Sequence, residues 1–320
     1  MSLKVFLRNL KFLFGYAVGE ELRDCQRCLF EHSNRLLYLE MMGMENSEFA
    51  EEIRFLKSLG KTVIFPYPSC ARLDHVESGL DARSQLPYVV HKGNCLYFPR
   101  TWSVRDAENT YRNFIETENI LGGGYTAKAP HQYQTDTFCV NAGDVVVDVG
   151  AAEGLFSLDV AERASKLYLF ESDFIWREPL RRTFAPYAEK TVIIPKWVSD
   201  RNSRNSIRLD TALAEEKGRP IFIKMDIEGS EVMVVESSKL FLMSEQSVRL
   251  ACCTYHRADD ARRLECLFHE MQYRTEFSSG FMLNLRRHLD PPYFRHGLIR
   301  ASRNSCDFHG ISFLTMPSET

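Results

Sequence analysis

Val-Val-Val-Asp-Val-Gly-Ala-Ala-Glu-Gly (residues 145–154), followed by Leu-Tyr-Leu-Phe-Glu (residues 167–171), is the stretch that decides the fold. An apolar, β-branched run leads to Asp148, a turn with Gly150 and Gly154 follows, and a second apolar run ends at Glu171. The pattern predicts strand, glycine turn, helix and a second strand ending in an acid, which is how an α/β sheet holds a nucleoside. Gly150 permits the tight turn, Gly154 lets the helix pack close to the strand, and Glu171 can accept hydrogen bonds from ribose hydroxyls.

The residues inside the glycine turn limit the class of ligand that it can bind. A dinucleotide site uses a further glycine so that the backbone can approach a pyrophosphate, but that position is Ala152, followed by Glu153. The carboxylates of Asp148 and Glu153 are expected to repel a diphosphate. They suit a cationic or zwitterionic adenosine compound such as S-adenosylmethionine.

Strand and helix patterns alternate from residue 144 onward, which predicts a parallel sheet with helices on both faces. Two later pieces, 275–278 and 282–285, predict a hairpin that adds an antiparallel edge. The expected strands are 145–149, 167–171, 191–195, 221–226 and 249–255, and the expected helices are 154–164, 174–184, 230–243 and 258–272.

The first part of the chain, up to about residue 140, does not show this regular alternation of strands and helices. Apolar stripes predict helices over 19–42 and 45–59, and a short strand over 62–66 follows. A hairpin is expected over 87–98, and a helix over 103–119 with Ser103 as its N-cap. The three glycines at 122–124 mark the expected domain boundary. The His- and Tyr-rich stretch 126–140 is expected either to fold over the nucleoside pocket or to be an ordinary connecting loop.

A second group of polar residues lies in Ile-Phe-Ile-Lys-Met-Asp-Ile-Glu-Gly-Ser-Glu (residues 221–231). A buried strand ends at Asp226, so this carboxylate and that of Glu228 are expected in the cleft beyond the strand ends. His256 follows the next expected strand. Helix capping explains Ser230 and Glu231 without a functional role.

The segments 148–154, 170–171 and 223–231, with Tyr255-His256, resemble the FkbM family of S-adenosylmethionine-dependent methyltransferases. The resemblance covers roughly residues 140–290; Ala152 departs from it, because the family often has Asn there. It implies a Rossmann-like class I methyltransferase with a mostly parallel seven-stranded sheet over 123–320. It further implies O-methylation of a hydroxyl on a sugar or polysaccharide precursor or a secondary metabolite. Residues 1–122 lie outside it and are expected to cover the substrate or to form a homodimer.

These patterns assign roles to individual residues. The glycine turn and Glu171 are expected to hold the methionine and ribose parts of the cofactor, and Ser199-Asp200 to contact the adenine. The expected cofactor-binding residues are Asp148, Gly150, Ala151, Glu153, Gly154, Glu171, Ser172, Ser199, Asp200 and Asp226. His256, Asp226 and Glu228 are the three candidates for the catalytic base that removes the acceptor's proton.

Two further roles are open at this point. Asp226 can alternatively ligate a divalent cation that acidifies the acceptor, although no other metal ligand set is indicated. Arg286, Arg287 and His288 either bind an anionic substrate group or form a solvated basic turn.

Composition excludes several partners. The 320 residues carry a net charge of −3, so no global field favours nucleic acid or an anionic membrane. Nine scattered cysteines fit reduced thiols in the cytosol, and Cys25 and Cys28 lack a second ligand pair at zinc-site spacing. The uncharged stretch 12–19 is too short to span a bilayer. We therefore expect a cytoplasmic protein with a small-molecule or glycan-precursor acceptor, no nucleic acid partner and no transmembrane segment.

Two other functions compete with methyl transfer. A non-catalytic methyltransferase-like binding module would keep the fold, but the acids at Asp148, Glu171 and Asp226 argue for chemistry. An NAD(P)-dependent Rossmann oxidoreductase predicts a further glycine and no acid at Glu153.

Overall fold

The computed structural model describes residues 36, 39, 43–44, 47–69, 72–122, 128–244, 247–284 and 291–303. These residues belong to two compact units, one from Met1–Pro68 and Phe281–Arg295 and the other from Ser69–Gly280 and His296–Thr320. Most of the helix expected over 19–42 and the basic residues 286–288 lie outside the described residues. No helix in the described ranges is long and apolar enough to cross a membrane.

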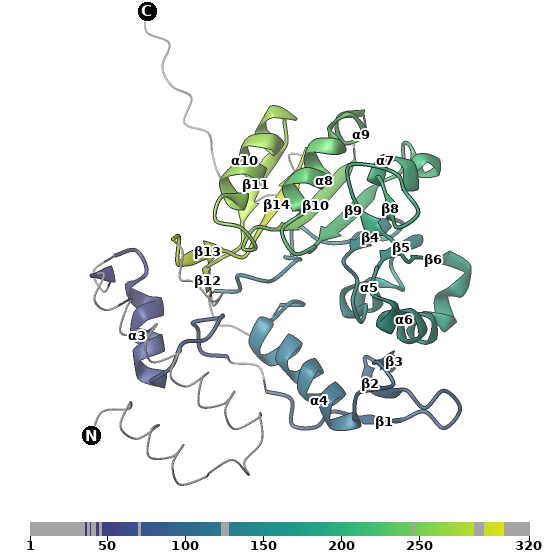
Figure 1. Ribbon diagram of the computed structural model, residues 1–320, viewed down its shortest axis with the longest axis horizontal. Coiled ribbons are helices and arrows are strands. Elements are labelled where there is room, and N and C mark those ends of the chain that lie inside the picture. Colours follow the sequence, from purple (N-terminus) through teal and green to yellow (C-terminus); the bar gives the residue numbers. More distant parts are fainter. Residues whose placement is uncertain are drawn as a thin grey trace, which may run out of the picture. The chain divides into compact units, whose positions relative to one another are not determined.

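A seven-stranded sheet forms the centre of the larger unit (Figure 1). Its order is β11-β14-β10-β9-β4-β5-β6, and β14 runs antiparallel to both of its neighbours while the other pairs are parallel. The strands are β4 (Val145–Val149), β5 (Lys166–Phe170), β6 (Thr191–Ile194), β9 (Ile221–Met225), β10 (Val248–Cys253), β11 (Arg274–Phe277) and β14 (Leu298–Ser302). This arrangement confirms the predicted α/β, Rossmann-like fold with a mostly parallel seven-stranded sheet.

The edge of the sheet differs from the predicted hairpin. Strand β11 pairs with β14, not with the segment that follows it, and β12 (Phe281–Leu283) pairs with β13 (Phe294–His296) in a separate two-stranded sheet. Every residue of β14 is buried, so this strand needs hydrogen-bonding partners on both sides. It obtains them by inserting between β10 and β11.

Alternate side chains of the sheet enter two separate cores, as period-2 strands require. Val146 and Phe222 pack in one core with α5 (Leu155–Val160) and α6 (Arg177–Thr183). Val147 and Ile223 pack in the other core with α8 (Glu231–Ser237), α9 (Lys239–Ser244) and α10 (Asp260–Glu270). The predicted covering of both sheet faces by helices is thereby confirmed.

Residues 76–118 form a layer that shares the α5 and α6 core. It consists of the antiparallel strands β1 (Ser78–Leu80), β2 (Pro87–His91) and β3 (Asn94–Tyr97), then α4 (Val104–Arg112) and the wider π-turn Asn113–Glu118. The predicted hairpin and the Ser103 N-cap are confirmed. Val89, Leu96 and Phe98 are fully buried in that core. The compact units divide at residue 68. The domain boundary expected after residue 122 stays a prediction.

The smaller unit has a core of its own. Helix α3 (Ala50–Leu59) packs Ile53 and Leu56 with Leu283 and Phe294. The strand expected over 62–66 is not formed, although the Ile64 carbonyl accepts a hydrogen bond from the Leu283 N–H.

Short elements complete the description. They are η4 (Phe174–Trp176), η5 (Ala185–Lys190), the paired strands β7 (Trp197–Val198) and β8 (Ser206–Ile207), α7 (Leu209–Ala212) and η6 (Ala214–Glu216).

Truncating a central core residue tests this packing. Phe222 is fully buried in β9, so Phe222→Ala is expected to lower the free energy of unfolding by about 3–5 kcal/mol. Leu240 is 85% exposed, and Leu240→Ala should change it by less than about 0.5 kcal/mol. Urea unfolding measures both, and equal effects would contradict the burial described here.

Candidate active site

The glycine turn after β4 is shaped by a close backbone contact. Gly150, Ala152 and Gly154 have φ values of 83°, 45° and 85°. A Cβ atom on Gly150 would lie 1.9 Å from the carbonyl oxygen of Asp226, so only glycine fits there. A Cβ atom on Gly154 would lie 2.8 Å from the Phe184 ring, so this glycine lets α5 pack tightly.

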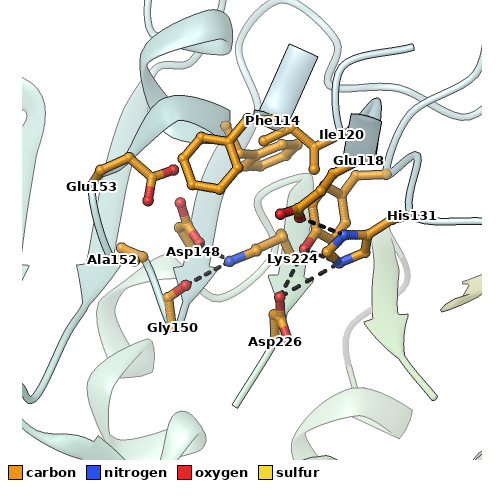
Figure 2. A pocket seen from close by; sticks show the side chains of 13 residues that line it. Phe114, Glu118, Ile120, His131, Asp148, Gly150, Ala152, Glu153, Lys224 and Asp226 are labelled. Carbon is orange, nitrogen blue, oxygen red and sulfur yellow. Dashed lines mark hydrogen bonds and ion pairs between the residues drawn. The ribbon is translucent and has the colours of Figure 1, made fainter. Parts of the chain in front are cut away.

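Lys224 joins this turn to β9 and compensates the charge of Asp148. Its Nζ lies 3.0 Å from Asp148 Oδ1 and donates a 2.6 Å hydrogen bond to the Gly150 carbonyl (Figure 2). Burial opposes the lysine's charge, but Asp148 and Asp226 outweigh it and hold the pKa of Lys224 above its ordinary value. Asp148 is therefore a buried carboxylate whose charge is paired with that of Lys224.

Glu153 lines the same cavity from the glycine turn, and its predicted electrostatic role stays a prediction. Its side chain points into the cavity beside the turn (Figure 2). Burial raises the pKa of this carboxyl from 4.5 to about 7. A cation placed in the cavity would favour the ionised form.

Glu171 supports the glycine turn from the end of β5. Its Oε2 accepts a 2.9 Å hydrogen bond from the Ala152 N–H, and its Oε1 accepts one of 2.7 Å from the Asp173 N–H. Ser199 Oγ donates to Asp200 Oδ1 at 3.0 Å after β7. Glu171, Ser172, Ser199 and Asp200 are not among the described residues that line the cavity, so their cofactor contacts remain predictions.

Asp226 lies at the centre of a polar cluster. The Tyr133 hydroxyl donates to Oδ2 at 3.1 Å and the Tyr255 hydroxyl to Oδ1 at 3.3 Å. His131 Nε2 and His256 Nε2 lie 3.6 and 3.4 Å from the carboxylate. Burial opposes ionisation, but His131, Lys224 and His256 outweigh it and hold the pKa of Asp226 well below its usual range. A carboxylate held ionised in this way is a weak proton acceptor.

The other two predicted bases lie away from the cavity lining. His256 is buried with Nδ1 2.9 Å from Glu231 Oε1, and the surrounding carboxylates outweigh burial and raise its pKa. Glu228 is 86% exposed, with Oε2 3.7 Å from His256 Nε2. Of the three predicted bases, only Asp226 lines the cavity.

Helix capping after Asp226 also differs from the prediction. Ser230 makes no side-chain capping hydrogen bond at the start of α8. The Glu231 carboxylate instead accepts a 2.9 Å hydrogen bond from the Ile227 N–H, because the left-handed conformation at Glu228 folds the preceding turn back onto the helix.

A cavity of about 150 Å³ lies over the glycine turn, within the larger unit. Some lining residues come from the glycine turn and the strand ends, and the others come from the segment 114–133 that precedes β4 (Figure 2). The expectation that 126–140 folds over the pocket is confirmed for His131 and Tyr133. The lining residues are Phe114, Glu118, Ile120, His131, Tyr133, Asp148, Gly150, Ala151, Ala152, Glu153, Phe156, Lys224 and Asp226.

Sequence reasoning missed Phe114 and Glu118. Both lie in the π-turn that continues α4, where hydrogen bonds spanning five residues shift side chains relative to a regular helix. The 103–119 pattern reads as an ordinary amphipathic helix, so no sequence signal locates this shift.

The solved structures that this chain resembles are distant from it in sequence. No protein-family model matches the chain, and no curated protein matches it significantly. TYW2 of M. jannaschii, solved in complex with AdoMet, is 13% identical with a TM-score of 0.37 and covers 68% of this chain and 84% of its own. The precorrin-6y C5,15-methyltransferase of Geobacter metallireducens is 11% identical (TM-score 0.37; 52% and 84%). The 23S rRNA methyltransferase ErmE is 15% identical (TM-score 0.33; 53% and 66%).

The close contact at Gly150 is testable by a matched pair of variants. Gly150→Ala is expected to displace the end of β9 and abolish ligand binding at the turn, because its Cβ overlaps the Asp226 carbonyl. Gly143 has a similar φ of 89° but open space around its Cβ, so Gly143→Ala should cost only about 1–2 kcal/mol of backbone strain. Urea unfolding and nucleoside-binding calorimetry measure both effects. Equal losses in the two variants would contradict the contact.

Glu153 predicts a pH dependence of stability. Its folded-state pKa of about 7 exceeds the ordinary 4.5, so the native state binds the extra proton between these values. Stability is therefore lost as the pH rises through this window, by at most about 3 kcal/mol. Glu153→Gln removes that loss and should be more stable than the parent at about pH 8, with the gain shrinking towards about pH 5. A gain that is independent of pH would contradict this assignment.

Proposed function

We propose that the protein is an S-adenosylmethionine-dependent O-methyltransferase of the FkbM type. The observation that carries the proposal is the acid-lined cavity over the glycine turn at the centre of this sheet. Glu118, Glu153 and Asp226 line that cavity in addition to the paired Asp148.

The charge of the cavity favours a sulfonium cofactor over a diphosphate. Four carboxylates face Lys224 and His131, and Lys224 is bound to Asp148 and the turn. Among the described lining residues, a pyrophosphate at the turn would meet Glu153, while the basic residues Lys224 and His131 are already paired with carboxylates. A sulfonium cation would instead stabilise the ionised form of Glu153.

The geometry of the turn supports the same assignment. Ala152 occupies the place of a dinucleotide glycine, and its N–H is bonded to Glu171 instead of facing a phosphate. The antiparallel β14 also separates this sheet from the all-parallel order of dinucleotide-binding folds.

Different groups of residues are assigned to different parts of the cofactor. S-adenosylmethionine, when bound, supplies a methyl group activated by its positive sulfur. Gly150–Gly154 hold the methionine part, Glu171 with Ser172 the ribose, and Ser199-Asp200 the adenine. An acceptor hydroxyl bound in the cavity would be aligned with this methyl group and would release its proton to solvent water. Asp226 faces the acceptor side of the cavity as an ionised group, which suits cation binding better than proton transfer.

The acceptor and the setting are proposed from the sequence alone. They are a sugar or polysaccharide precursor or a secondary metabolite, in the cytoplasm, with no nucleic acid partner. Residues 1–122 are proposed to cover the substrate or to form a homodimer.

Calorimetry with S-adenosylhomocysteine tests the function. We expect saturable binding, and Glu171→Ala should weaken it about 10- to 100-fold through lost ribose and turn hydrogen bonds. Glu178→Ala is the matched control, because this exposed glutamate pairs only with Arg100 among its described ion pairs and should leave binding unchanged. No heat at millimolar S-adenosylhomocysteine would refute the proposal, and NADH binding instead would favour the oxidoreductase alternative.

A further inference from the structure

Four different donor atoms meet behind the cavity. His131 Nε2 lies 3.0 Å from the Tyr133 hydroxyl, 3.6 Å from Asp226 Oδ2 and 3.6 Å from Cys253 Sγ. The Tyr133 hydroxyl lies 3.1 Å from Asp226 Oδ2 and 3.8 Å from Cys253 Sγ. His131, Asp226 and Cys253 each offer a ligand atom within 4.8 Å of the others.

Three of these five separations match the distances between ligand atoms in a tetrahedral metal site. Zinc binds nitrogen, oxygen and sulfur at about 2.0–2.3 Å, so its ligand atoms lie about 3.3–3.8 Å apart in a tetrahedron. Of the five separations, two are hydrogen-bond distances slightly below this range and three lie within it. A small adjustment of the Tyr133 hydroxyl therefore suffices to admit an ion.

The surroundings orient the ligands as an outer shell does in metal sites. His131 Nδ1 lies 3.2 Å from Glu118 Oε2, so this carboxylate can fix the tautomer that leaves Nε2 for a metal (Figure 2). The second oxygen of Asp226, Oδ1, is held by Tyr255 and His256. The contact of Glu118 with His131 and the contacts of Asp226 Oδ1 are observations independent of the distances between the four donor atoms.

The donor set selects the kind of metal. Imidazole and thiolate favour zinc or a similar transition ion over magnesium or calcium, which prefer oxygen ligands. His131 and Cys253 are buried and come from different segments, the loop before β4 and the end of β10.

We propose that His131, Asp226, Cys253 and the Tyr133 hydroxyl form a binding site for one Zn²⁺ ion at the wall of the cavity. The Cys253 thiol releases its proton to solvent on binding. Because Tyr133 lines the cavity, an acceptor hydroxyl can replace it as the fourth ligand, and the ion would lower the pKa of that hydroxyl. The zinc site goes beyond the proposed methyl transfer and is testable without the acceptor or the cofactor.

The test uses the full chain, stripped with a chelator and titrated with ZnCl₂ in a calorimeter. We expect one equivalent bound, with affinity lowered about 100-fold or more in Cys253→Ser and His131→Asn. Cys252→Ser is the matched control, because this neighbouring buried cysteine faces the other core and should bind as the parent does. Tyr133→Phe should give a smaller loss.

Two further measurements keep the outcome decisive. Replacing zinc with Co²⁺ should give a thiolate-to-cobalt charge-transfer band in the parent, which needs no variant to fold. Repeating the titration with Cys25 and Cys28 both changed to serine separates that Cys-x-x-Cys pair from the proposed site. No saturable binding, equal binding by Cys253→Ser, or loss of binding only when Cys25 and Cys28 are changed would overturn the proposal.

Discussion

The buried bridge made by Lys224 is the interaction on which the site depends. One ammonium group binds the Asp148 carboxylate of β4 and the Gly150 carbonyl of the glycine turn, and so ties β9 to both. Breaking such a buried pair from one side leaves an uncompensated charge in the core, which typically costs about 3–5 kcal/mol. The bridge holds the glycine turn close to the end of β9, where Asp226 lies. It also compensates the negative charge of Asp148 that a ligand would otherwise meet.

With Asp148 compensated, the remaining acids determine what the cavity can hold. Glu153 is driven towards its neutral form by burial, whereas Asp226 is kept ionised by the cationic groups around it. Two carboxylates that line the same cavity thus differ in protonation because their neighbours differ. On the proposed function, the ionised Asp226 is the stronger of the two attractions for a cation in the cavity.

The sequence was sufficient for the parts of the molecule with a strict period or a forced conformation. The parallel strands, the two helical layers and the glycine turn follow from alternation, helix spacing and glycine chemistry, and the structure confirms them. The strand order at the edge could not be predicted from the sequence, because β14 pairs with β11 across some twenty intervening residues. The burial of every β14 residue, which requires partners on both sides, is visible only in the folded chain. Motifs at the strand ends pointed to Asp226, which lines the cavity, and to His256 and Glu228, which are not among its lining residues. Glu118, His131 and Cys253 come from three separate segments, and only their packing brings them together.

A crystal structure of the chain with S-adenosylhomocysteine tests the central claim most directly. We expect the sulfur and amino acid part over Gly150–Glu153 in the cavity, and the ribose hydroxyls within hydrogen-bond distance of Glu171. The Lys224 bridge to Asp148 and Gly150 should be unchanged. A ligand bound elsewhere, or no ligand in the cavity at saturating S-adenosylhomocysteine, would contradict the assignment of this turn as a sulfonium-cofactor site.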